Sequence, residues 1–135
     1  MSTDLYICST FRNDWNRSFN LALEAEMITV GFRCYLPQRD SEQLGNRKAT
    51  FLADKGGIDA AKLIIAVGSQ TQTANWGFEV GYAFALKKPV IILTDKEHPA
   101  ELMPEGAVDK ILVVDNLDDF SSYAPELAEE VRRLI

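Results

Sequence analysis

Short apolar runs alternate along the chain with longer segments in which apolar residues recur every three or four positions. The runs predict five strands, at residues 5–9, 33–36, 63–67, 90–93 and 111–114. The periodic segments predict helices at residues 13–30, 46–55, 75–87 and 117–135, with a polar loop at 38–45 and a loop or short helix at 97–106. Because strands alternate with helices, we expect a single α/β domain over residues 1–135, built on a doubly wound parallel sheet. Five strands fit the flavodoxin-like order 2-1-3-4-5.

The same periodicity indicates which helical residues face the core. The first helix carries an apolar stripe, with Asn13 or Asp14 as its cap and Gly31 at its end. The stripe is Trp15, Phe19, Leu23, Met27 and Val30. Pro125 either starts or kinks the main segment of the terminal helix.

Two further helices carry weaker or more ambiguous stripes. In the helix at 46–55, Phe51 and Leu52 are expected to point inward, and Gly56-Gly57 to break the helix. The helix at 75–87 is expected to bury apolar residues at spacings of four, namely Phe78, Tyr82 and Leu86.

Composition narrows the classes of partner. The net charge of −6 argues against a nucleic-acid polymer or an anionic membrane as the main partner. No apolar run approaches membrane-spanning length and the first residues lack a signal-peptide pattern, so we expect a cytoplasmic protein. Cys8 and Cys34 are expected to be reduced, buried thiols on strands. The only histidine, His98, is expected in a solvated loop, and nothing implies a metal or an organic cofactor.

Glu79 is the leading candidate for chemistry. It is expected in or near the first turn of a helix that follows the third strand, facing the loop at 9–12 across the crevice where ligands bind in such sheets. Gly77 and Gly81 each cost about 1 kcal/mol relative to alanine, which indicates that something approaches the helix closely. A carboxylate there is expected to stay ionised and could act as a nucleophile. An acidic residue near a helix start also complements the helix dipole, and that alternative stays open.

Other polar residues have two interpretations each. Tyr6 is either a packed aromatic or a hydroxyl that reaches the crevice to hold a carboxylate. Arg12 is either a surface arginine or, beside Ser9 and Thr10, part of an anion site. Asp54 on its own is typical of a solvated helix residue.

Four stretches together resemble the nucleoside 2-deoxyribosyltransferase family. They are Tyr6-Ile7-Cys8-Ser9, Asp54 before Gly57-Ile58, the segment Gly77 to Ala83, and Lys88-Pro89-Val90. The resemblance implies the flavodoxin-like fold and a homodimer or larger homo-oligomer whose sites are completed across subunits. It also implies three roles. Glu79 would attack the anomeric carbon of a 2-deoxyribosyl group, Tyr6 would orient Glu79, and Asp54 would handle the base and its proton.

The sequence departs from the transferases at the residues that would hold the 5′ end of the substrate. Thr73 stands where they usually carry an aspartate, whereas the related 2′-deoxynucleoside 5′-monophosphate N-hydrolases carry a phosphate-contacting serine. That branch also shows the pattern of Tyr6 to Arg12, with Thr10 for a serine. Lys110 replaces an asparagine of the transferases and is expected to reach a neighbouring subunit's site. The expected substrate-binding residues are Ser9, Thr10, Phe11, Arg12, Thr73, Asn75, Gly77 and Lys110.

The resemblance therefore implies an enzyme that cleaves the N-glycosidic bond of 2′-deoxynucleosides or their 5′-monophosphates. The sugar would pass to another base or to water, and the partner would be a small-molecule nucleoside or nucleotide. Two alternatives remain open at this point. One is a nucleotide-binding or sensing module without turnover, and the other is a glycosidase acting on a ribosyl compound.

Overall fold

The computed structural model describes residues 3–68 and 73–135. Its five strands form one parallel sheet in the order β2-β1-β3-β4-β5, which confirms the predicted fold class and strand order. The strands are β1 (Leu5–Cys8), β2 (Cys34–Tyr35), β3 (Leu63–Gly68), β4 (Val90–Asp95) and β5 (Lys110–Val114). β1 lies between β2 and β3, where Tyr6 pairs with Tyr35 on one side and with Ile64 on the other.

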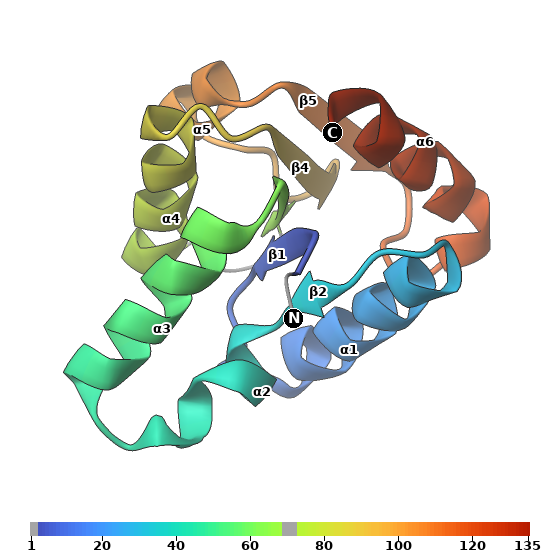
Figure 1. The fold of residues 1–135 in the computed structure, drawn as a ribbon. Coiled ribbons are helices and arrows are strands. Elements are labelled where there is room, and N and C mark those ends of the chain that lie inside the picture. Colours follow the sequence, from blue (N-terminus) through green and yellow to red (C-terminus); the bar gives the residue numbers. More distant parts are fainter. Residues whose placement is uncertain (1–2, 69–72) are drawn as a thin grey trace.

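Helices cover both faces of the sheet (Figure 1). They are α1 (Asp14–Thr29), α2 (Pro37–Asp40), α3 (Arg47–Ala60), α4 (Ala74–Ala85), α5 (Leu102–Ala107) and α6 (Ala124–Leu134), with short 3-10 turns η1 (Glu42–Leu44) and η2 (Phe120–Ser122). α1 and α6 lie on one face, and α3 and α4 lie on the other. Within the described residues, no helix is long and apolar enough to cross a membrane.

Alternation along β1 divides the core into two layers. Leu5 and Ile7 pack with the buried residues of α1 and α6, whereas Tyr6 and Cys8 pack with those of α3 and α4. Cys8 and Cys34 are free and buried on their strands, as predicted. A side chain that points from α3 or α4 toward β1 therefore meets the side chains of Tyr6 and Cys8.

Local sequence signals set several helix ends. The Asn13 side chain accepts a hydrogen bond from the Asn16 backbone N–H at 2.8 Å, and Gly31 ends the α1 region with a φ of +96°. Thr73 caps α4 in the same way, through the Trp76 N–H. Pro125 lies in the first turn of α6, so it starts that helix and does not kink it.

The prediction for residues 38–55 was wrong in three respects. Residues 37–44 form α2 and η1 and are not a loop. α3 continues through Gly56-Gly57 to Ala60, and Phe51 and Leu52 point outward, 44% and 53% exposed. The glycines do not break the helix because α3 packs on the sheet, with Gly57 lying directly against the Tyr35 ring.

The buried face of α4 was also predicted wrongly. Trp76, Val80 and Ala83 are buried, whereas Phe78 is 61% exposed and Leu86 is also exposed. The helix is apolar on most of its surface, so two different stripes fit a helical period and the sequence does not select between them. Because α4 begins at Ala74, Glu79 lies in its second turn and not in the first.

Two aliphatic residues of α3 test the orientation of this helix. We expect Ile58→Ala to lower the free energy of unfolding by about 2–4 kcal/mol, because Ile58 is 2% exposed. Leu52→Ala should change it by less than about 0.5 kcal/mol, because the side chain already faces water. Urea denaturation of both variants measures the two values. Equal losses would contradict this orientation of α3.

Candidate active site

A cleft of about 640 Å³ opens between α3, α4 and the segment that precedes α3. Asp54 of α3 and Glu79 of α4 both line it, so two of the three residues expected to be catalytic face the same space. The described lining residues are Glu42, Gly45, Asn46, Arg47, Thr50, Phe51, Asp54, Lys55, Ile58, Asn75, Phe78, Glu79 and Tyr82.

The environment of Glu79 favours its neutral form more than the sequence implied. Burial raises the pKa of Glu79 to about 7, and the negative charge of Asp54 adds to the rise. The Tyr6 hydroxyl and the Cys8 thiol oppose it by favouring the carboxylate. The expectation that Glu79 stays ionised was therefore wrong, because the carboxyl lies largely out of water. Near neutral pH it is divided between its two forms.

The third predicted residue, Tyr6, lies beneath Glu79 on β1. Its side chain is fully buried, and its hydroxyl has no hydrogen-bond partner of good geometry within the described part of the chain. Burial, followed by the charge of Glu79, raises the pKa of Tyr6, so the phenol stays neutral. A buried hydroxyl without a partner is costly, and here its proton is free to serve the Glu79 carboxylate.

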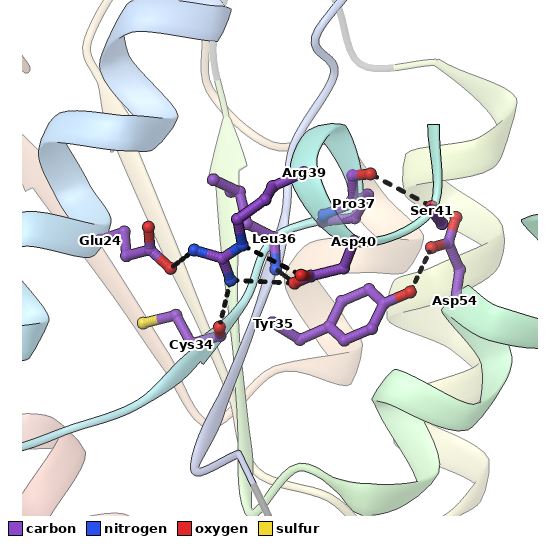
Figure 2. A network of polar contacts seen from close by, with 9 residues as sticks. All are labelled: Glu24, Cys34, Tyr35, Leu36, Pro37, Arg39, Asp40, Ser41 and Asp54. Atoms are coloured by element: carbon purple, nitrogen blue, oxygen red, sulfur yellow. Dashed lines mark hydrogen bonds and ion pairs between the residues drawn. The ribbon is translucent and has the colours of Figure 1, made fainter. Parts of the chain in front are cut away.

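Asp54 is held by a neighbour that the sequence did not indicate. The Tyr35 hydroxyl donates a hydrogen bond to Asp54 Oδ1 at 3.0 Å (Figure 2). Burial raises the pKa of Asp54, while the Ser41 and Tyr35 hydroxyls lower it by favouring the carboxylate. The net upward shift helps Asp54 to carry a proton. Asp54 is thus not the solvated helix residue that its position alone would indicate.

The first loop, at residues 9–12, does not line this cleft. Ser9 Oγ donates to the Thr10 carbonyl at 3.2 Å and accepts from the Asn16 amide at 3.3 Å. Thr10 Oγ1 accepts the Arg12 N–H at 3.4 Å, and the Arg12 side chain is exposed. Phe11 packs under the Arg17 guanidinium, 5.4 Å from its ring centroid. The hydroxyls of this loop are partly occupied by local hydrogen bonds.

The other residues expected to bind substrate do not all lie at the cleft. Asn75 lines the cleft, and the Thr73 hydroxyl serves as the cap of α4. A side chain at Gly77 would meet only open space. Lys110 begins β5 and pairs with Ile91, so it lies at the amino edge of the parallel sheet, away from the carboxyl ends of the strands. The structure therefore does not bring Lys110 to this chain's own cleft.

Two aromatic side chains form an outer wall of the cleft. The Phe51 and Phe78 ring centroids are 6.4 Å apart, and both residues are exposed. Both had been assigned to the core because apolar residues at helical spacing usually pack inward. Their neighbours in the sequence give no sign that they face a cleft.

His98 is not a freely solvated residue. Its Nδ1 lies 2.9 Å from Asp95 Oδ1, and the side chain is three-quarters buried. Within residues 3–68 and 73–135, no three His, Cys, Asp or Glu side chains gather as metal ligands.

The family model for nucleoside 2-deoxyribosyltransferase matches residues 5–125. The chain belongs to the nucleoside 2-deoxyribosyltransferase family. No curated protein matches the sequence significantly. Family members act on nucleosides or nucleotides, and family and fold together support a deoxyribosyltransferase or N-glycosidase class of enzyme.

Solved structures show the same fold at low sequence identity. A 2-deoxyribosyltransferase from Bacillus psychrosaccharolyticus superposes with a TM-score of 0.74 at 17% identity, covering 93% of this chain and 95% of that one. A conserved protein from Enterococcus faecalis V583 superposes with a TM-score of 0.77 at 20% identity, with both chains fully covered. The Clostridium botulinum CMP N-glycosidase BcmB superposes with a TM-score of 0.71 at 15% identity, covering 94% of this chain and 98% of that one.

The raised pKa of Glu79 leads to a prediction about stability. A carboxyl that titrates near 7 in the folded chain and near 4.5 when unfolded destabilises the fold as pH rises between these values. We expect the wild-type chain to lose about 1–3 kcal/mol of stability from this residue between pH 4.5 and 8. Glu79→Gln should lack that component. Urea denaturation at both pH values measures the difference, and parallel losses in the two proteins would contradict the raised pKa.

Proposed function

We propose that this chain cleaves the N-glycosidic bond of 2′-deoxynucleosides or their 5′-monophosphates, with Glu79 as the nucleophile. One observation carries the proposal. Glu79 and Asp54 line the same cleft, and the buried Tyr6 hydroxyl beside Glu79 has no other described partner. A nucleophilic carboxylate, its hydrogen-bond donor and a second carboxyl are the groups that retaining glycosidic cleavage requires.

The steps follow from these positions. The ionised Glu79 carboxylate attacks the anomeric carbon as the bond to the base breaks, and Asp54 gives a proton to the leaving base. Tyr6 donates a hydrogen bond to Glu79 and stays neutral throughout. Water or a second base then attacks the same carbon and displaces Glu79. Asp54 takes up the proton that the incoming group releases, which restores the free enzyme.

The outer wall of the cleft suits the flat face of a base. The Phe51 and Phe78 rings are exposed, and Ile58 adds apolar surface below them. Aromatic rings bind bases by stacking, which favours a planar heterocycle without specifying its hydrogen-bond pattern.

The 5′ end of the substrate would lie toward Ser9, Thr10, Arg12 and Thr73. The exposed Arg12 guanidinium supports a phosphorylated substrate, since it follows β1 at the carboxyl edge of the sheet. The name of one structural neighbour, a CMP N-glycosidase, also supports a nucleotide as substrate. The 2-deoxyribosyltransferase neighbour supports transfer between bases.

We further propose that two copies associate through the outer face of α4. Phe84 is 59% exposed on this helix and does not line the cleft, and a side chain at Gly77 or Gly81 would meet nothing within 4 Å. An exposed apolar side chain marks a contact surface, and glycines beside it leave room for a second helix to approach closely.

Removal of the nucleophile tests the reaction. We expect Glu79→Ala to lower base release by a factor on the order of 10³ or more, because the covalent route is lost. Chromatography of free base measures release from each deoxynucleoside and each 5′-monophosphate, with and without a second base. Glu129→Ala, on exposed α6 surface, is the control. Full activity of Glu79→Ala would refute the mechanism, whereas nucleotide binding without release by the wild type would favour a sensing module.

Association through α4 has its own test. We expect Gly81→Glu to lower the fraction of dimer by about tenfold or more at micromolar concentration, because a charge would enter the apolar contact. Gly81 is exposed, so the monomer should fold normally. Sedimentation velocity measures the oligomeric state, and Gly106→Glu, at another open glycine, is the control. An unchanged dimer in Gly81→Glu would place the interface elsewhere.

A further inference from the structure

The Tyr35 side chain contacts both halves of the proposed site. Its ring lies parallel to that of Tyr6, with centroids 5.2 Å apart and an angle of 10° between the planes. Its hydroxyl donates to Asp54 Oδ1 at 3.0 Å. Tyr6 and Tyr35 are register partners on neighbouring strands, so the sheet sets their spacing. One residue therefore packs on the tyrosine beside Glu79 and binds the second carboxyl directly.

Gly57 completes the slot that holds the Tyr35 ring. A Cβ atom at this position would lie 3.0 Å from three atoms of the ring, closer than ordinary van der Waals contact. The ring is thus confined between Tyr6 and the backbone of α3, one turn beyond Asp54. Glycine inside a helix costs about 1 kcal/mol relative to alanine, and here that residue provides the space for the ring. The adjacent Gly56 has nothing within 4 Å of such an atom.

The backbone on both sides of Tyr35 is tied to α2 (Figure 2). The Leu36 N–H donates to Asp40 Oδ2 at 2.8 Å, and the Arg39 guanidinium donates to the Cys34 carbonyl at 2.9 Å. Arg39 also pairs with Asp40 and with Glu24. These contacts fix the position of Tyr35 without help from its hydrogen bond to Asp54. The Tyr35 hydroxyl is therefore a fixed donor that can hold the Asp54 carboxyl in place.

We infer that Tyr35 is a positioning residue, which holds the Asp54 carboxyl in the orientation that reaches the leaving base. This inference rests on the proposed function. Tyr35 is not one of the described residues that line the cleft, so it acts through Asp54 and not by touching the substrate. Its hydrogen bond also favours the ionised form of Asp54, against the burial that raises the pKa of this carboxyl.

Tyr35→Phe tests the role because it keeps the ring and removes only the hydroxyl. We expect kcat for base release to fall by about 10–100-fold with little change in KM, since Asp54 loses its orientation. Without the donor the pKa of Asp54 should rise, so the pH of maximal kcat/KM should move upward. The substrates are the deoxynucleosides and 5′-monophosphates from which the wild type releases base.

Two alanine variants of α3 provide the matched comparison. Gly57→Ala should reproduce the loss of kcat and the shift in pH optimum, because the new methyl group displaces the Tyr35 ring. Gly56→Ala makes the same change one residue earlier, in open space, and should leave both quantities unchanged. If Gly57→Ala does not fold, Tyr35→Phe alone decides the question.

A measurement without substrate separates this inference from the proposed function. Carbon-detected NMR titration gives the pKa of the Asp54 carboxyl in the wild type and in Tyr35→Phe. A higher value in the variant, together with the loss of kcat, supports the positioning role. An unchanged Asp54 pKa, or a kcat within about twofold of an active wild type, overturns this inference alone. No base release by the wild type from any substrate overturns the proposed function and this inference with it.

Discussion

The cost of removing the Glu79 carboxylate from water governs how the candidate site is built. Burial raises the pKa of this carboxyl, the charge of Asp54 adds to the rise, and no cation is among the described groups that shift it. The neighbours that favour its ionised form are a neutral phenol and a thiol, Tyr6 and Cys8. A lysine in their place would hold the charge strongly and make it a poorer nucleophile. In the proposed reaction, neutral donors would leave the carboxylate reactive once a cation-like sugar forms beside it.

Regular elements, and not loops, position the three groups. β1 is central in the sheet, and its alternation directs Tyr6 and Cys8 to the face that α3 and α4 cover. The two helices flank β3 in the sequence, one before it and one after it, so each brings a carboxyl to the same face. Packing of these helices on the sheet therefore sets the separation of Asp54 and Glu79, and loop conformation has little part in it.

The alternation of strands and helices was enough to predict the strand order, which the structure confirms. The family resemblance pointed to Tyr6, Asp54 and Glu79, and the structure places Asp54 and Glu79 on one cleft, whereas the catalytic roles of the three residues stay predictions. The sequence was not sufficient for the buried faces of α3 and α4, since each helix carries more than one apolar stripe. Tyr35 could not be identified, because its contacts with Tyr6 and Asp54 join residues that are distant in the chain. Gly57 was assigned as a helix breaker, because its close approach to a ring on another element leaves no trace in the sequence around it.

Under the proposed function, the exposure of Phe51 and Phe78 separates recognition of the base from the chemistry at Glu79. Residues beneath Glu79 belong to the packed core, so replacing them endangers the whole domain. The two phenylalanines sit on the outer surface of their helices and contribute little to that core. If the two rings stack on the base as proposed, changes at these positions would alter the choice of base at small cost in stability. The cleft wall is the place where a laboratory selection for new nucleoside substrates should begin.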